Sequence, residues 1–201
     1  MTCSHDEGVT WGWFQGGFRP TTTTNGWAVT FLKASEYQDG HAGYSDPVDE
    51  QHFIASTINS IQQSKDWDST AIFVAYDDSD GWYDHVTPPI VNGSADSAND
   101  DPALCGGKPA SGGYADRCGY GPRLPLLAIS PFSKTNFVDH SRTDQSSILR
   151  FIEDNWGTGR IGDSSFDARA GSVENMFDFH GPKNPKPVLL DPTTGAVVSK
   201  H

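Results

Sequence analysis

Basic residues are scarce in this sequence of 201 amino acids. It has 14 Lys and Arg against 26 Asp and Glu, which gives a formal net charge of −12 at pH 7. A protein that grips a nucleic-acid backbone needs a clustered basic face, and an anionic membrane attracts clusters of Lys and Arg. Because the sequence has no such cluster, we expect no nucleic-acid partner. The excess of acid either keeps the protein in solution or gathers at a cation site.

Long apolar runs are also missing. The longest, Ala71–Tyr76 and Leu124–Ile129, are far shorter than the roughly 20 residues that a transmembrane helix needs. Met1–Thr10 has no apolar stretch behind a basic end, so we expect no signal peptide in this chain. The hydrophobic fraction is 35%, and 21 Gly and 13 Pro indicate much loop, whereas eleven Phe and six Trp can fill a core. We therefore expect one domain over residues 1–201, with its core in 8–177 and a loop-rich tail at 178–201.

The three cysteines cannot all pair within the chain. Cys105 and Cys118 flank the Gly-rich loop CGGKPASGGYADRC, which contains no His to complete a zinc site. A disulfide is the favoured interpretation, and it predicts an oxidising compartment, either outside the cell or in the periplasm. Cys3 is left over, and its fate is open.

The order of apolar and capping signals predicts the fold class. Three compact apolar runs indicate buried strands at Ala28–Leu32, Ala71–Tyr76 and Leu124–Ser130. Asp46 and Pro47 begin a helix that fades near Ser64, and a second helix covers Asp144–Trp156, with Gly157 as its stop. Strands that alternate with helices predict an α/β fold with a mostly parallel sheet flanked by helices.

The densest chemistry lies in Ala75–His85, whose sequence AYDDSDGWYDH holds four Asp and one His. Asp77 and Asp78 directly follow a predicted strand, at the edge where α/β folds place their sites. Adjacent carboxylates repel each other unless they share a cation, so this segment predicts a metal site. The alternative is a solvated acidic turn. An EF-hand is excluded, because the Asp spacing differs and the closing Glu is absent.

Three histidines can join this site from neighbouring loops. His41 follows the first predicted strand, His85 ends the acidic segment, and His140 lies just before the second helix. Loops on one sheet edge that supply His and paired Asp suit metal-assisted hydrolysis of an anionic ester. A single loop His is also a common surface residue, so this alternative stays open for each.

Five longer stretches of the sequence resemble a known family. The strings TWGWFQGGFRP, YQDGHAGYSDPVDEQHF, DWDSTAIFVAYDDSDGWYDHV, RCGYGPRLPLLAISPFSK and SILRFIEDNW resemble the bacterial phosphoesterase family of acid phosphatases and phosphatidylcholine-type phospholipases C. That family belongs to the alkaline phosphatase superfamily, and the resemblance covers most of residues 8–177. It implies an α/β/α core and a divalent metal ion, whether Ca, Zn, Mg or Mn.

The resemblance also implies roles for single residues. Asp77 and Asp78 stand where the family has metal-ligating aspartates, and His41 stands where a histidine contacts the substrate phosphoryl group. His85 and His140 match recurrent positions and are the remaining catalytic candidates.

The sequence also departs from the family. It lacks the ENxSFD-like Glu-Asn metal motif and the later Ser or Thr nucleophile, and a block with paired histidines is missing between Trp27 and Val29. The chain therefore resembles a truncated alkaline-phosphatase-like core. Replacement ligands could come from Asp39, Asp80, Asp84 or another chain. Ser45 or Thr10 could replace the nucleophile, although a structural role fits each better.

These observations favour a metal-dependent hydrolase of phosphate esters, either a phosphomonoesterase or a phospholipase C-like phosphodiesterase. One alternative is a carboxylesterase, against which stands the absence of a G-x-S-x-G nucleophile elbow. Another is a catalytically impaired metal-binding remnant that pairs with a second chain, for example as a homo-oligomer. In its favour, a shortened sheet exposes an edge that another chain can cover.

Overall fold

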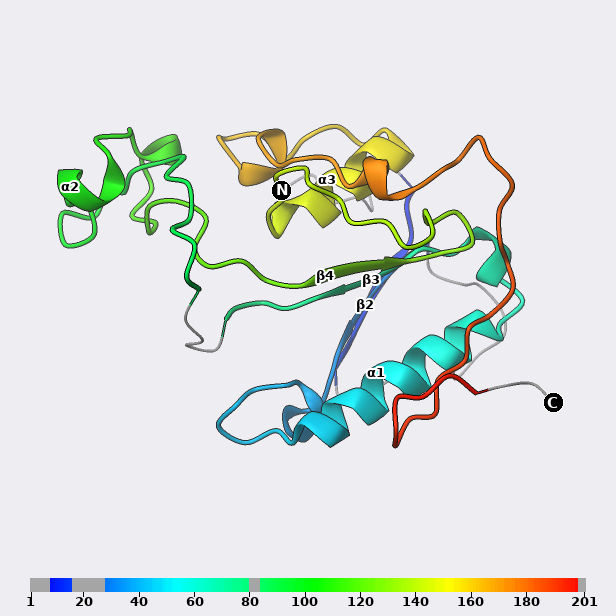
Figure 1. The fold of residues 1–201 in the computed structure, drawn as a ribbon. Coiled ribbons are helices and arrows are strands. Elements are labelled where there is room, and N and C mark those ends of the chain that lie inside the picture. The colour runs from blue at the N-terminus through cyan, green and yellow to red at the C-terminus, as the bar shows by residue number, and fades with distance from the viewer. Residues whose placement is uncertain (1–7, 16–27, 80–83, 199–201) are drawn as a thin grey trace. The chain divides into compact units, whose positions relative to one another are not determined.

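The computed structural model describes residues 8–15, 28–79 and 84–198 (Figure 1). The chain divides into two compact units. The unit of residues 73–127 and 138–175 contains both disulfide cysteines and is called the disulfide unit. The other comprises the described residues of 2–72, 128–137 and 176–201, and is called the α1 unit after its long helix.

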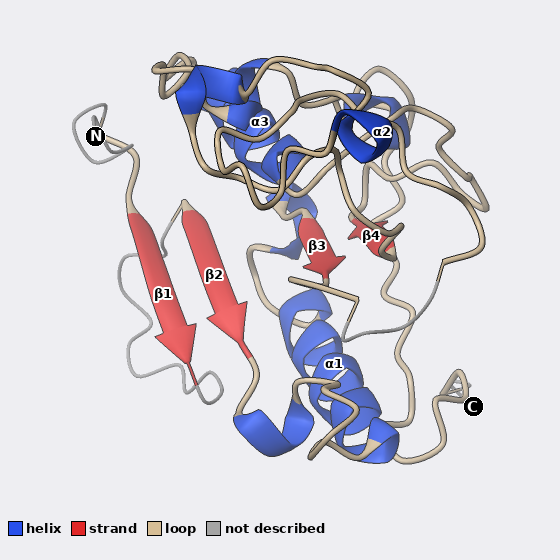
Figure 2. Ribbon diagram, turned by 90° about the vertical axis from the view of Figure 1, so that its left-hand side faces the viewer, coloured by secondary structure: helices blue, strands red, loops and turns tan. Residues whose placement is uncertain are grey.

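Two parallel strands form the sheet of the α1 unit (Figure 2). Strand β1 covers Trp11–Gln15 and strand β2 covers Val29–Lys33, close to the predicted strand at Ala28–Leu32. Trp11 lies opposite Val29, and Trp13 lies opposite Phe31. The rings of Trp13 and Phe31 stack with centroids 6.0 Å apart, yet Trp13 is 57% exposed. One face of this small sheet is therefore aromatic and open to solvent.

Helix α1 covers Pro47–Gln62 and begins as predicted. The Val48 N–H donates to Asp46 Oδ1 at 2.7 Å, which satisfies one of the backbone donors that a helix start leaves unpaired. Pro47 occupies the first turn, where no N–H is needed. The helix therefore starts where its local cap chemistry dictates.

The segment after residue 178, predicted as a loop-rich tail, is held along α1 (Figure 1). The Asn59 side chain donates to the Leu190 carbonyl at 2.6 Å and accepts from its N–H at 3.0 Å. Gln62 makes the same pair of bonds with Val188, at 3.0 and 2.8 Å. Each side-chain amide thus makes the pair of hydrogen bonds that a neighbouring strand would make with this backbone. The described part of the segment, up to residue 198, is therefore held against α1, although it contains no helix or strand.

The expectation of a mostly parallel sheet is not confirmed. Strand β3 (Ile72–Ala75) pairs with strand β4 (Leu126–Ile129), and the two run antiparallel. A parallel pair needs a crossover connection, usually a helix of about a dozen residues or more. Between β3 and β4 the longest described helix is α2, only four residues at Pro102–Cys105. The described part of the segment between the two strands is mostly irregular loop and not a crossover helix, which is compatible with the antiparallel direction.

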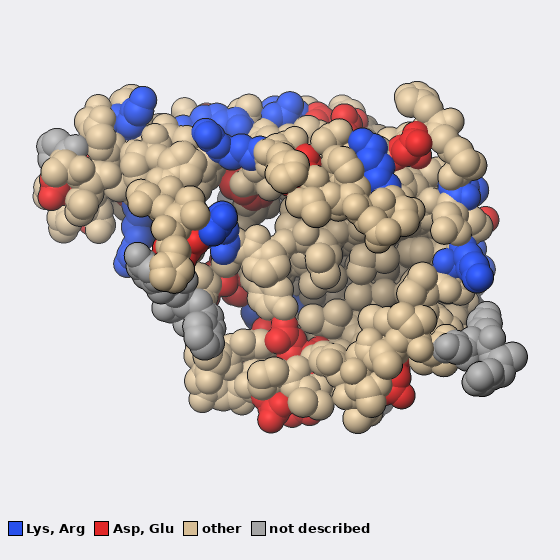
Figure 3. Space-filling model, viewed as in Figure 1, with Lys and Arg blue, Asp and Glu red and all other residues tan. Residues whose placement is uncertain are grey.

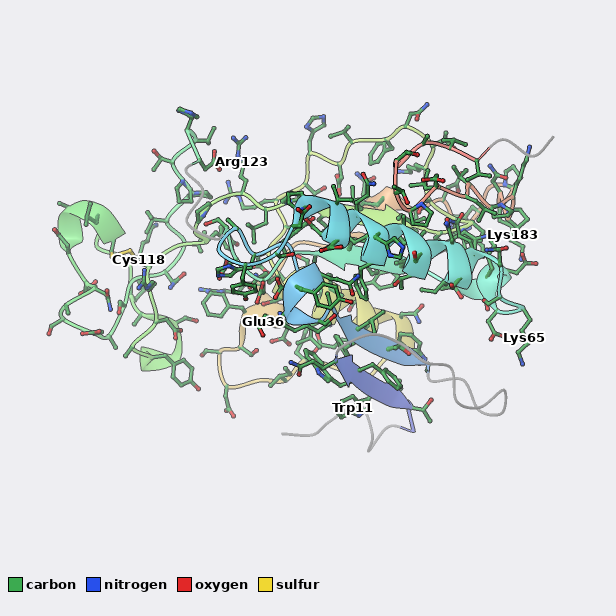
Figure 4. All side chains as sticks on the ribbon, turned by 90° about the horizontal axis from the view of Figure 1, so that it is seen from below. Trp11, Glu36, Lys65, Cys118, Arg123 and Lys183 are labelled. Carbon is green, nitrogen blue, oxygen red and sulfur yellow. A yellow bond between two sulfur atoms is a disulfide. The ribbon has the colours of Figure 1, made fainter. Side chains whose placement is uncertain are left out.

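The predicted disulfide is present in this loop and links Cys105 to Cys118 (Figure 4). Cys105 is fully buried at the end of α2. Nearby, the buried Asn92 side-chain amide donates to the Arg117 carbonyl at 3.2 Å, and the Asn92 backbone carbonyl accepts from the Gly119 N–H. The disulfide therefore lies in a packed loop rather than in an open one.

Reducing this disulfide should destabilise the protein by about 3 kcal/mol, because it closes a loop with a sequence separation of 13 residues. Urea unfolding of the Cys3→Ser variant with and without dithiothreitol measures the effect. Cys105→Ser/Cys118→Ser should match the reduced protein and be insensitive to the reductant. An unfolding midpoint that reduction leaves unchanged would show that the loop holds without the bond.

Helix α3 (Ser146–Trp156) ends at Gly157, which adopts φ +67° as the predicted stop requires. It starts slightly after the predicted Asp144, whose carboxylate accepts from the Ser146 N–H at 2.7 Å. Near its end Glu153 is 5% exposed beside Asp167, which is 1% exposed. Arg160 contacts Glu153 at 3.1 Å. Burial, together with the charge of Asp167, raises the pKa of the Glu153 carboxyl.

This raised pKa makes stability depend on pH with a defined sign. A carboxyl whose pKa is higher in the folded state favours folding at low pH, and this contribution is lost as the pH rises through the folded-state value. Glu153→Gln, which imitates the protonated form, should therefore be more stable than the wild type near neutral pH and lose that advantage in acid. Urea unfolding of both proteins from about pH 4 to about pH 7 tests this. A difference that shrinks with rising pH would contradict it.

Candidate functional site

Asp77 and Asp78 lie just beyond β3, which ends at Ala75, and both are exposed. The Gln145 side chain donates to the backbone carbonyls of Tyr76, at 3.2 Å, and of Asp77. The segment that leads into α3 is thus anchored to the start of the acidic segment. Sequence reasoning missed Gln145, because nothing in its local sequence indicates a partner 68 residues away.

The other end of the acidic segment is fixed by Arg123. The Arg123 guanidinium donates to Asp84 through Nε, at 2.9 Å to Oδ2, and Nη2, at 2.8 Å to Oδ1. The Arg123 and Val86 N–H groups also donate to this carboxylate, each at 3.0 Å. These bonds hold the pKa of Asp84 well below its usual range. Since both oxygens already accept hydrogen bonds, Asp84 does not fit the role of replacement metal ligand.

His85 and His140 are both exposed side chains of the disulfide unit. His85 is the central residue of the turn that Asp84 and Val86 close. Beside His140, the Asp139 carboxylate accepts from Ser141 at 3.0 Å and from Asn175 at 3.0 Å. Although burial opposes it, these hydrogen bonds lower the pKa of Asp139. The backbone around both histidines is therefore held by a neighbouring carboxylate.

His41 lies in the α1 unit, in the loop that precedes α1. The His41 N–H donates to Asp39 Oδ1 at 3.0 Å, and the Gly43 N–H donates to His41 Nδ1 at 2.9 Å. The imidazole stacks on the Tyr44 ring with centroids 3.9 Å apart. Since Nδ1 accepts a hydrogen bond, the neutral ring carries its proton on Nε2. His41 is thus an exposed, oriented donor at Nε2.

Two other residues of this loop have structural tasks. The Ser45 hydroxyl donates to the Tyr37 carbonyl at 3.0 Å and accepts from the Gly40 N–H at 3.1 Å. This supports the structural interpretation of Ser45 over the nucleophilic one. Gly40 has φ +85°, and a Cβ there would lie 2.9 Å from the Glu50 carboxyl carbon. The loop therefore favours glycine at this position because of its backbone angle, whereas the Cβ contact falls on the end of the flexible Glu50 side chain.

If the chain hydrolyses phosphate esters, as the resemblance implies, Gly40→Ala should displace the His41 loop and lower that hydrolysis by on the order of tenfold or more, since a small misplacement of a reacting group is costly. Steady-state kinetics of this variant tests the effect. Gly195→Ala is a suitable control, because Gly195 has φ +69° in the same unit and a Cβ there meets Gln51, which has no proposed role. Equal activity losses in the two variants would point to general destabilisation instead.

The donors for a metal ion are of a suitable kind but incomplete. Asp77 and Asp78 offer the oxygen ligands that hard divalent cations prefer. Within residues 8–15, 28–79 and 84–198, however, no group of three or more His, Cys, Asp and Glu could hold a metal ion. Asp80, one of the suggested replacement ligands, lies outside the described residues. The described side chains therefore do not complete a metal site.

Lys and Arg are interspersed with Asp and Glu on the face drawn in Figure 3. Among the residues that the structure describes, no helix is long and apolar enough to cross a membrane.

The comparison with known proteins agrees with the resemblance. The profile of the Phosphoesterase family matches residues 27–159. The non-hemolytic phospholipase C of Pseudomonas aeruginosa is 32% identical over 82% of this chain, and phospholipase C B of Mycobacterium tuberculosis is 34% identical over 65%. Non-specific phospholipase C1 of Arabidopsis thaliana is 28% identical over 63%.

The matched regions cover 25%, 26% and 24% of these three relatives. The chain thus spans about a quarter of the length of the curated proteins it matches. The family match itself covers more than half of the chain. The chain therefore belongs to the Phosphoesterase family.

Proposed function

We propose that this chain hydrolyses phosphate esters, as a phosphomonoesterase or a phospholipase C-like phosphodiesterase. The observation that carries the proposal is the Asp77–Asp78 pair at the carboxyl end of β3, in a chain of this family. Curated relatives named phospholipase C support the same reaction class. The sequence has no G-x-S-x-G motif, which makes a carboxylesterase the less favoured alternative.

His41 has the role of a hydrogen-bond donor in this proposal. Its Nε2–H would donate to a phosphoryl oxygen, where negative charge grows during hydrolysis. The Gly43 N–H on Nδ1 supports this assignment, because it keeps the proton on the opposite nitrogen. His85 and His140 would assist by taking a proton from water and giving one to the leaving oxygen.

Asp77 and Asp78 would supply two ligands of a divalent cation, which is Ca, Zn, Mg or Mn. The remaining ligands would come from Asp80, which lies outside the described residues, or from a second chain. Such a cation supplies positive charge to phosphoryl oxygens and activates water. In this proposal the chain's own hydrogen-bond donor is His41, and its proton-transfer groups are His85 and His140.

Four chromogenic substrates test the proposed reaction class. These are p-nitrophenyl phosphate, its bis-ester, p-nitrophenylphosphorylcholine and p-nitrophenyl acetate. Hydrolysis of the first alone would identify a phosphomonoesterase, and preference for the second or third a phosphodiesterase. Turnover of the acetate alone, unaffected by chelation, would instead favour the carboxylesterase.

A second candidate function is action together with a second copy of this chain. Within the described residues the β1–β2 sheet consists of two strands, and its Trp13 is 57% and Trp11 40% exposed, whereas parallel sheets are normally covered on both faces. Sedimentation velocity of the wild type and of Trp13→Ser tests this. A dimer that Trp13→Ser dissociates would support it, and a wild-type monomer at all concentrations would contradict it.

The disulfide also bears on location. We propose that the chain works outside the cytosol, secreted or in the periplasm, because the Cys105–Cys118 bond persists only where thiols are oxidised. Trapping of free thiols in the native host, followed by mass spectrometry, tests this. Two reduced cysteines at positions 105 and 118 would contradict the proposal.

A further inference from the structure

Asp84 and Arg123 form an ion pair next to His85, and neither residue has a role in the proposed reaction. We infer that Arg123 is a positioning residue that fixes His85 through the carboxylate of Asp84. The inference rests on the proposed function, in which His85 takes part in proton transfer. Arg123 itself is not assigned any contact with the substrate.

The geometry of the contact determines the direction of the Asp84 side chain. Arg123 supplies three donors to one carboxylate, two from the planar guanidinium and one from its own backbone. A guanidinium fork that binds both oxygens fixes orientation as well as distance. The Arg123 backbone N–H adds a third donor, so the carboxylate is held against the chain and not only against a long side chain.

The carboxylate in turn fixes His85. Asp84 Oδ1 accepts both from Arg123 Nη2, at 2.8 Å, and from the Val86 N–H, at 3.0 Å. This second bond closes a turn around His85. Because the same oxygen joins the guanidinium to the turn, a change at Arg123 reaches the His85 backbone through Asp84.

Exposure separates the tasks of the two partners. The Asp84 side chain is 12% exposed, whereas that of Arg123 is 72% exposed. The exposed guanidinium therefore lies on the solvent side of the Asp84 carboxylate, and the carboxylate lies between it and the turn around His85.

The direction of the strands explains why these residues meet. Asp84 follows β3, and Arg123 precedes β4. Since the two strands run antiparallel, the last residue of β3 and the first residue of β4 lie at the same end of the strand pair. The acidic segment is thus held near its start by Gln145 and near its end by Arg123.

Kinetics of single and double variants test the inference. Asp84→Asn, Arg123→Ala and the double variant should each lower kcat by about 10²-fold with little change in KM, because a misplaced proton-transfer group costs about that much. Arg123→Lys keeps the charge but loses the fork, and should lie between these and the wild type. Lys183→Ala removes an exposed ion pair with Asp68 and should retain wild-type kcat.

The double variant decides between positioning and direct contact. If Arg123 acts only through Asp84, the double variant is no worse than either single variant. Additive losses would overturn the inference. So would an Arg123→Ala variant with a raised KM beside an unaffected Asp84→Asn, because that pattern indicates direct substrate binding by Arg123.

A measurement without substrate separates this inference from the proposed function. The ring proton resonance of His85, assigned with His85→Asn, should move to the same position in Asp84→Asn and in Arg123→Ala, and stay in place in Lys183→Ala. A His85 resonance that neither variant moves would overturn the inference. A wild type that hydrolyses no phosphate ester would refute the proposed function, whereas the resonances would still test the positioning.

Discussion

Replacing His41 by Ala should lower kcat/KM for phosphate-ester hydrolysis by about 10²- to 10³-fold, the usual cost of one donor to a developing oxyanion. The physical reason is the fixed tautomer, in which the Gly43 N–H holds Nδ1 and leaves the proton on Nε2. His41→Gln retains an N–H donor and should recover part of the loss. Steady-state kinetics of both variants measures the effect.

The matched control for this prediction is His52→Ala. His52 is an exposed histidine of α1 in the same unit, and no role is assigned to it. It should leave kcat/KM unchanged. If His41→Ala is as active as this control, the phosphoryl contact assigned to His41 is wrong, although other parts of the reaction could still hold.

The double variant Asp77→Asn/Asp78→Asn should lose activity by on the order of 10²-fold or more, since even groups that only support a metal ligand cost up to about 10²-fold. The change removes two negative charges while keeping the shape of both side chains. It should also abolish the binding of one equivalent of Mn²⁺, measured by the loss of the free-ion electron paramagnetic resonance signal.

An acidic pair elsewhere provides the control for this variant. Asp66 and Asp68 are exposed and lie outside the acidic segment. Asp66→Asn/Asp68→Asn should keep both Mn²⁺ binding and activity. Loss of Mn²⁺ binding in both double variants would mean that overall negative charge, and not Asp77 with Asp78, attracts the cation.

Much of the local structure could be predicted because its causes are local. Asp46 and Pro47 start α1, and Gly157 ends α3, through caps made within a few residues. The apolar runs gave the positions of β3 and β4, and the spacing of Cys105 and Cys118 gave the disulfide. The single domain over residues 1–201 stays a prediction.

The rest depends on contacts between distant residues. The direction of β4 against β3 has no signal in either apolar run, and the loop that joins the two strands has no periodic pattern. In the sequence, Asn59 and Gln62 are ordinary polar residues of a helix. Their hydrogen bonds to the backbone of Leu190 and Val188 could not be predicted, because these partners are far away along the chain.

The candidate site shows the same division. The Asp77–Asp78 pair was predicted at a strand end, and the structure places it there. The partners Arg123 and Gln145 could not be predicted, because each joins the acidic segment from a remote part of the chain. Which of the site residues act together stays a prediction, since His41 belongs to one unit and the other candidates to the other.

The most direct test of this account is the metal dependence of phosphate-ester hydrolysis by the wild type. Hydrolysis of p-nitrophenyl phosphate and of its bis-ester is measured before EDTA, after EDTA, and after restoring Ca²⁺, Zn²⁺, Mg²⁺ or Mn²⁺ separately. We expect activity that EDTA removes and at least one of these ions restores. No turnover of either ester by folded protein, with each of the four ions in excess, would contradict it and leave the metal-binding remnant as the better description.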